Sequence, residues 1–72
     1  MPRLFSSTQI IAVLQKNGFM FVSQKGSHAK YRKTAGGKIL TVIVPANKKE
    51  IPHGTFRSIL RQSQLNLGDF LK

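Results

Sequence analysis

The chain has 72 residues, of which 12 are Lys or Arg and two are Asp or Glu, so its formal net charge at pH 7 is +10. This length predicts a single domain, residues 1–72, with a small core. The chain contains no cysteine, which excludes a disulfide scaffold, a thiolate zinc site and a cysteine nucleophile. The excess of positive charge indicates a polyanionic partner, which is a nucleic acid, an anionic membrane surface or an acidic protein.

The two carboxylates, Glu50 and Asp69, restrict the possible chemistry further. A two-metal phosphoryl-transfer site needs several carboxylates to hold its ions, and a glycosidase needs a pair that flanks one bond. We therefore predict that the protein uses no metal and no cofactor. Any catalysis must then depend on His, Ser, Thr, Tyr, Lys or Arg.

The apolar segments are short, and none approaches the roughly 18 residues that a membrane-spanning helix needs. The N-terminal residues contain no apolar stretch of the signal-peptide type. We expect a cytoplasmic protein that does not bind membranes. A cationic membrane-active peptide is a further class, which the strand-like segments and the lack of a long amphipathic basic helix disfavour.

The first predicted element is a helix over about residues 7–17. Ser6 and Gln9 have the spacing of a capping box, and Ile10 and Leu14 lie on one helical face. Gly18 follows the helix at a position that favours glycine, because a residue with positive φ commonly ends a helix.

Three strands are predicted next, over residues 19–23, 28–32 and 38–44. A polar turn separates the first two, and a hairpin turn at residues 34–37 separates the second from the third. The third strand is apolar on both faces, so we expect it to be central or largely covered. Pro45 ends it, because proline cannot donate a hydrogen bond to a sheet.

A basic loop over residues 47–54 precedes a second helix, which we expect to begin at Thr55. Asn66 is placed to cap a last short turn over residues 67–71. The order of elements is α-β-β-β-α. It predicts an α+β fold in which helices cover one face of a three-stranded antiparallel sheet and leave the other face open.

Alternation along the second strand directs Ala29 and Tyr31 to the core and His28, Lys30 and Arg32 to the open face. A neutral imidazole can accept a proton, so His28 is a candidate proton-transfer group. RNA supplies its own nucleophile, the 2′-hydroxyl group, so such a site needs neither a metal nor a protein nucleophile. The alternative interpretation is an exposed histidine beside a solvated basic strip.

Other basic and small residues extend this hypothesis. Gly26, beside Lys25 and Ser27, either lets a phosphate approach the backbone or simply forms the turn. A second phosphate-binding strip is predicted at Lys48, Lys49, Arg57 and Arg61, with a solubilising charged face as the alternative. His53 is interpreted as structural, with a capping role before the second helix. The five phenylalanines suit a core better than a base-stacking platform.

Several segments together resemble the HicA family of bacterial and archaeal toxins. They cover most of the chain, and the combination of Gly-Ser-His with Gly-Thr-Phe-Arg-Ser-Ile-Leu-Arg is specific; the segments are residues 17–19, 24–32, 41–45 and 49–62. The resemblance implies a double-stranded-RNA-binding-domain-like fold, and it implies that His28 is the catalytic histidine.

The resemblance also implies a function. HicA proteins are mRNA interferases of type II toxin–antitoxin systems, which cleave RNA without a metal and arrest translation. A HicB-type antitoxin covers the active surface. His53 gains no catalytic support from the family pattern. The expected partners are therefore mRNA and a HicB-type antitoxin, and the alternative is an RNA-binding module of the same fold without catalysis.

Overall fold

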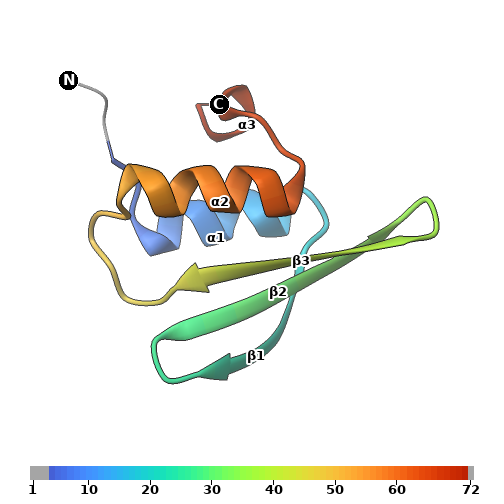
Figure 1. Ribbon diagram of the computed structural model, residues 1–72, viewed down its shortest axis with the longest axis horizontal. Helices are drawn as coiled ribbons and strands as arrows, with labels where there is room; N and C mark the ends of the chain where they lie inside the picture. Colours follow the sequence, from blue (N-terminus) through green and yellow to red (C-terminus); the bar gives the residue numbers. More distant parts are fainter. Residues whose placement is uncertain (1–3, 72) are drawn as a thin grey trace.

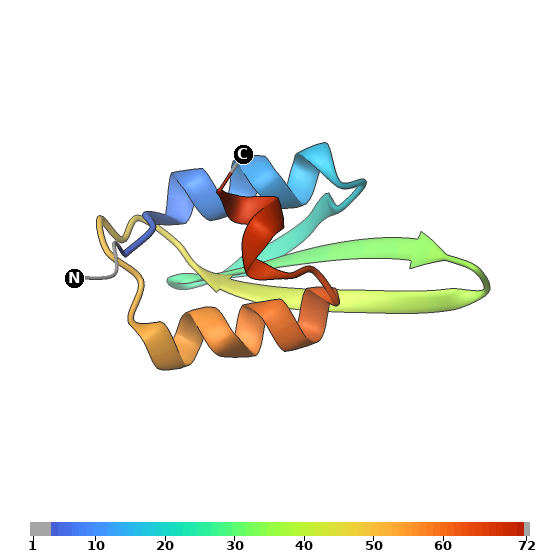
Figure 2. The same cartoon turned by 90° about the horizontal axis from the view of Figure 1, so that it is seen from above.

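The computed structural model describes residues 4–71. Its elements confirm the predicted α-β-β-β-α order; they are α1 (Ser7–Lys16), β1 (Met20–Lys25), β2 (His28–Ala35), β3 (Lys38–Pro45), α2 (His53–Ser63) and α3 (Leu67–Phe70). The two long helices lie on the same face of the sheet (Figure 1). Seen from above, α3 lies between them (Figure 2). The opposite face of the sheet carries no element from residues 4–71, as predicted.

The three strands form an antiparallel sheet in the order β1-β2-β3, so β2 is central. Of the two alternatives for the third strand, central or largely covered, the central position is wrong, because short turns make consecutive strands neighbours and leave β3 at an edge. Its outer edge is nevertheless partly covered by α2. The backbone N–H of Ile43 donates a 2.9 Å hydrogen bond to Oε1 of Gln62.

The predicted boundaries differ from the observed ones by a few residues. Phe19 lies in the core, and its backbone N–H donates a 2.9 Å hydrogen bond to the carbonyl oxygen of Leu14 at the end of α1, so β1 begins after it and continues to Lys25. Gly36 and Gly37 both have positive φ, of 56° and 79°, which is typical of a two-residue hairpin turn. That tighter turn lets β2 continue to Ala35 instead of ending at residue 32.

The helix ends follow local capping rules. Ser6 and Gln9 form the predicted capping box of α1, and Asn66 caps α3. The second helix begins at His53, two residues before the expected start at Thr55, because Pro52 occupies the N-cap position. The φ of Pro52, −58°, is compatible with a helix start.

The core lies between the sheet and the two long helices. Phe5, Phe56 and Phe70 form an aromatic cluster on the helix side, with ring centroids 5.1 to 6.0 Å apart. Phe21 departs from the expected core role, since it is 54% exposed on β1 and contacts the ring of Tyr31. The buried hydrophobic residues are Ile10, Leu14, Phe19, Ala29, Tyr31, Val42, Val44, Ile51, Phe56, Ile59 and Phe70.

Candidate active site

The open face of the sheet carries three polar side chains of β2, which we call the basic row: His28, Lys30 and Arg32. His28 and Arg32 are exposed and Lys30 is half-buried, whereas the alternating Ala29 and Tyr31 are buried beneath the helices. The predicted alternation is therefore confirmed. Because β2 is central, neighbouring strands support the row on both sides.

A β-bulge in β1 determines which residue lies beside His28. Phe21 pairs with Tyr31, but Ser23 pairs with Lys30, so Val22 is the extra residue. Lys25 is consequently paired with His28. In a regular ladder Gln24 would take that position. Since directly paired side chains share a face, the bulge places Lys25 on the same face of the sheet as His28.

Two hydrogen bonds hold the turn between β1 and β2, one from a residue of β1 and one from the residue after β3. Gly26 has a φ of 60°, at the first central position of a two-residue hairpin loop, where glycine is favoured. The side-chain amide of Gln24 donates a 3.1 Å hydrogen bond to the carbonyl oxygen of Gly26. The backbone N–H of Ala46 donates to the carbonyl oxygen of Ser27. These contacts restrict the backbone immediately before His28.

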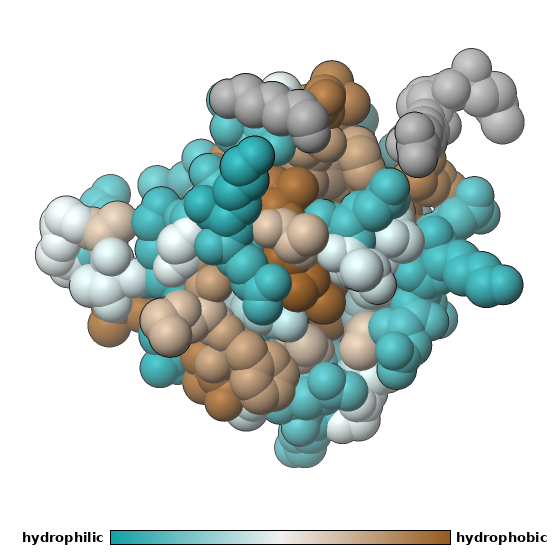
Figure 3. All heavy atoms as spheres, turned by 180° about the vertical axis from the view of Figure 1, so that it is seen from behind, coloured by the Kyte–Doolittle hydropathy of each residue, from teal (hydrophilic) through white to brown (hydrophobic). Residues whose placement is uncertain are grey.

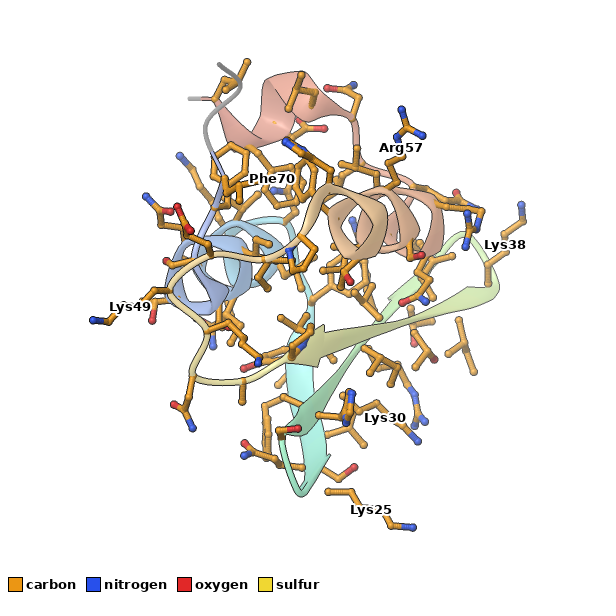
Figure 4. The ribbon with its side chains drawn as sticks, turned by 60° about the vertical axis from the view of Figure 1, so that its left-hand side comes forward. Lys25, Lys30, Lys38, Lys49, Arg57 and Phe70 are labelled. Carbon is orange, nitrogen blue, oxygen red and sulfur yellow. The ribbon has the colours of Figure 1, made fainter. Side chains whose placement is uncertain are left out.

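The remaining predicted basic residues do not lie on the open face. Figure 4 shows Lys25 and Lys30 at the sheet, Arg57 on α2, and Lys49 on the other side of the molecule. The loop before α2 is tied to α1, because the backbone N–H of Lys48 donates a 2.9 Å hydrogen bond to Oγ of Ser7. The basic row with Lys25 therefore lies apart from the helix-side cations, which are Lys48 and Lys49 in the loop before α2 and Arg57 and Arg61 on α2.

An apolar groove of about 500 Å³ lies on the helix side, between the N-terminal segment, α2 and α3. His53 and Arg57 line it together with apolar side chains, and no strand residue contributes. His53 therefore lies on the helix side, whereas His28 is on the open face of the sheet. The capping role expected for His53 is wrong, because Pro52 is the N-cap and α2 has no side-chain cap hydrogen bond.

The two carboxylates lie outside the open face. Asp69 accepts a 2.9 Å hydrogen bond from the backbone N–H of Asn66 at the start of α3, and Glu50 is exposed in the loop before α2. Within residues 4–71, no three potential metal-ligating side chains lie together. The chemistry available on the open face is anion binding by cations and proton transfer by one imidazole.

The chain was also compared with models of known protein families. A family model described as the HicA toxin of bacterial toxin-antitoxin systems matches residues 7–65. The chain belongs to the HicA toxin family. The match includes all residues of the basic row and its hairpin, and it implies an antitoxin partner. No curated protein matches this HicA chain. In the part of the chain that the structure describes, no helix is long and apolar enough to cross a membrane.

Proposed function

We propose that this HicA toxin is an endoribonuclease that cleaves mRNA, with His28 as its proton-transfer group, and thereby arrests translation. The observation that carries the proposal is the exposed imidazole of His28 in line with Lys30 and Arg32 and paired with Lys25. Alternate residues of a strand are about 6.6 Å apart, which is similar to the separation of successive phosphates along RNA. The row therefore suits a single RNA backbone.

The chemistry uses a nucleophile that the substrate supplies. The imidazole of His28 accepts the proton of an RNA 2′-hydroxyl group, and the 2′-oxygen attacks the adjacent phosphorus. The 5′-oxygen leaves with a proton from solvent, so the products are a 2′,3′-cyclic phosphate and a 5′-hydroxyl end. Lys25, Lys30 and Arg32 hold the phosphate and stabilise the charge that develops on its oxygens.

The helix-side cations and the turn complete the proposed RNA contacts. Gly26 and Ser27 present backbone to the phosphate beside His28. Lys48, Lys49, Arg57 and Arg61 bind a more distant part of the RNA, which must pass around the molecule to reach both surfaces. The proposed regulator is a HicB-type antitoxin that covers the open face, so that RNA and antitoxin compete.

The decisive experiment compares the two exposed histidines. His28→Ala is expected to lower the rate of RNA cleavage by about 10²–10⁴-fold, because it removes a general acid–base group. His53→Ala is the matched control, since His53 is also exposed but lies on the helix side. Circular dichroism checks that both variants fold. A folded His28→Ala protein that cleaves RNA as fast as wild type would disprove the catalytic assignment.

A second experiment tests whether the RNA 2′-hydroxyl group is the nucleophile. An oligonucleotide with a single 2′-deoxy residue at a mapped cleavage site is expected to bind normally and to resist cleavage at that site only. Cleavage at the deoxy position would show that water or a protein group attacks instead. A wild-type protein that binds RNA without cutting it would indicate the non-catalytic RNA-binding module.

A further inference from the structure

The outer edge of β1 is the most exposed apolar part of the sheet. All six residues of β1 are exposed, and Met20, Phe21 and Val22 are 73%, 54% and 41% exposed. Figure 3, which views the molecule from behind, shows apolar side chains gathered on its lower part, at the level where Figure 1 places the sheet. Exposed apolar edge strands are templates for pairing with another chain.

The two edges of the sheet differ in how they are covered. At β3, Gln62 of α2 accepts the hydrogen bond of the Ile43 N–H. At β1, no element within residues 4–71 pairs with the outer edge, because β1 is the last strand of the sheet order. The main-chain groups on that side of β1 are therefore available to an added strand.

We propose that the antitoxin partner adds an extended strand to the outer edge of β1. This inference rests on the antitoxin partnership of the proposed function and not on RNA cleavage. Strand addition supplies affinity through main-chain hydrogen bonds and specificity through alternating side chains. The added strand also anchors the antitoxin two strand spacings, about 10 Å, from the basic row, so adjoining segments reach His28.

The net charge of the chain distinguishes between the two possible occupants of the β1 edge, which are a second copy of this chain and the antitoxin. A second copy of this chain would bring another net charge of +10 against the first, and Lys25 lies at the end of β1. An acidic partner gains from the same field that repels a copy.

The register of β1 specifies the chemistry of the added strand. Met20 and Lys25 are on the open face, because they pair with Arg32 and His28, whereas Phe21 pairs with the buried Tyr31. The partner strand should therefore place apolar residues beside Met20 and Phe21, one on each face. It should place an acidic residue beside Lys25, on the face of the basic row.

Hydrogen exchange of the intact complex tests the main-chain pairing directly. The cognate antitoxin is added to the full-length chain, and amide exchange is measured by NMR in the free protein and in the complex. We expect amides on the outer edge of β1 to exchange at least about ten-fold more slowly in the complex. Unchanged exchange throughout β1 in a complex that has formed would overturn the proposal.

A matched pair of variants tests the side-chain contribution. Met20→Ser/Val22→Ser removes exposed apolar groups from β1, and Leu71→Ser, the control, removes one that is 68% exposed at the end of α3, away from the sheet. We expect the first variant to bind the antitoxin about ten-fold more weakly and the control to bind within two-fold of wild type. Equal affinities for all three proteins would overturn the proposal.

The oligomeric state of the free chain separates the two occupants. We expect a monomer in sedimentation at the concentrations used for binding. A dimer that Met20→Ser/Val22→Ser dissociates would assign the edge to a second copy and overturn the proposal. Protection of β1 by the antitoxin in a protein that does not cleave RNA would refute the proposed catalysis and support the strand addition.

Discussion

Gly26 adopts a backbone conformation that favours glycine, and it lies in the turn two residues before His28. Its φ of 60° lies in the left-handed region, and a Cβ added there would meet no atom within 4 Å. Gly26→Ala is therefore expected to lower the free energy of unfolding by roughly 1–2 kcal/mol through backbone strain alone. Gly26→Asn should lose less, because asparagine tolerates this region better. Urea denaturation of both variants measures the difference.

A control at the other hairpin separates the turn from RNA binding. Gly36 has a φ of 56° and equally open surroundings, but it lies at the far end of β2 from His28. We expect Gly36→Ala to lose similar stability and to keep the wild-type rate of RNA cleavage. Both Gly26 variants should slow cleavage. A normal rate in folded Gly26→Asn would limit Gly26 to forming the turn.

At the scale of elements, Gln62 joins α2 to the edge of β3. Gln62→Ala removes the acceptor of the Ile43 N–H in a partly buried position, so we expect it to lower the free energy of unfolding by about 1–3 kcal/mol. Gln62→Glu keeps an acceptor oxygen and should lose less. Gln15→Ala, on the exposed side of α1, is the control. Equal stabilities of Gln62→Ala and Gln15→Ala would show that the edge contact contributes nothing.

The elements that sequence reasoning identified are those with local causes. The capping box at Ser6 and the turn glycines act within a few residues, and alternation in β2 places His28 from its neighbours alone. The bulge at Val22 does not depend on residues close to it in sequence; it arises from how β1 pairs with β2. Val22 resembles its apolar neighbours, and only the pairing with β2 reveals it as the extra residue. For the same reason Lys25, and not Gln24, faces His28, which spacing along one strand does not predict.

The position of one element relative to another was also not predictable from the sequence. Lys48, Lys49, Arg57 and Arg61 extend a basic strip in sequence, but they lie in the loop before α2 and on α2, whereas the basic row lies on β2. The loop that carries Lys48 turns toward α1, where Oγ of Ser7 binds its backbone. The exposure of Phe21 has a similar origin, because β1 lies at the edge of the sheet, farthest from the helices (Figure 1).

At the scale of the whole molecule, cleavage is expected to survive excess EDTA. The chain has two side-chain carboxylates, and Asp69 is engaged at the start of α3. Mg²⁺ in nucleases is held by carboxylates and phosphates, which this open face does not supply on the protein side. The measurement is the cleavage rate of metal-stripped protein with EDTA. Lost activity that Mg²⁺ or Mn²⁺ restores would contradict the proposed mechanism.

The net charge of +10 predicts that RNA and antitoxin both reach the open face under electrostatic attraction. Lys30→Glu/Arg32→Glu reverses two charges of the basic row. We expect association with the antitoxin to slow by roughly ten-fold at low salt, with a smaller effect at moderate salt, where the charges are screened. RNA binding should weaken in the same variant. Stopped-flow association and RNA titration, each at both salt concentrations, measure the two effects.

The control must change the total charge equally without touching the basic row. Lys16→Glu/Lys38→Glu does so, since Lys16 ends α1 and Lys38 lies at the start of β3, beside the turn farthest from His28. If the local field of the row directs both partners, the control slows association much less than Lys30→Glu/Arg32→Glu. Equal slowing by both variants would leave only a general attraction to positive charge. Antitoxin binding that neither variant nor salt affects would rule out a surface shared with RNA.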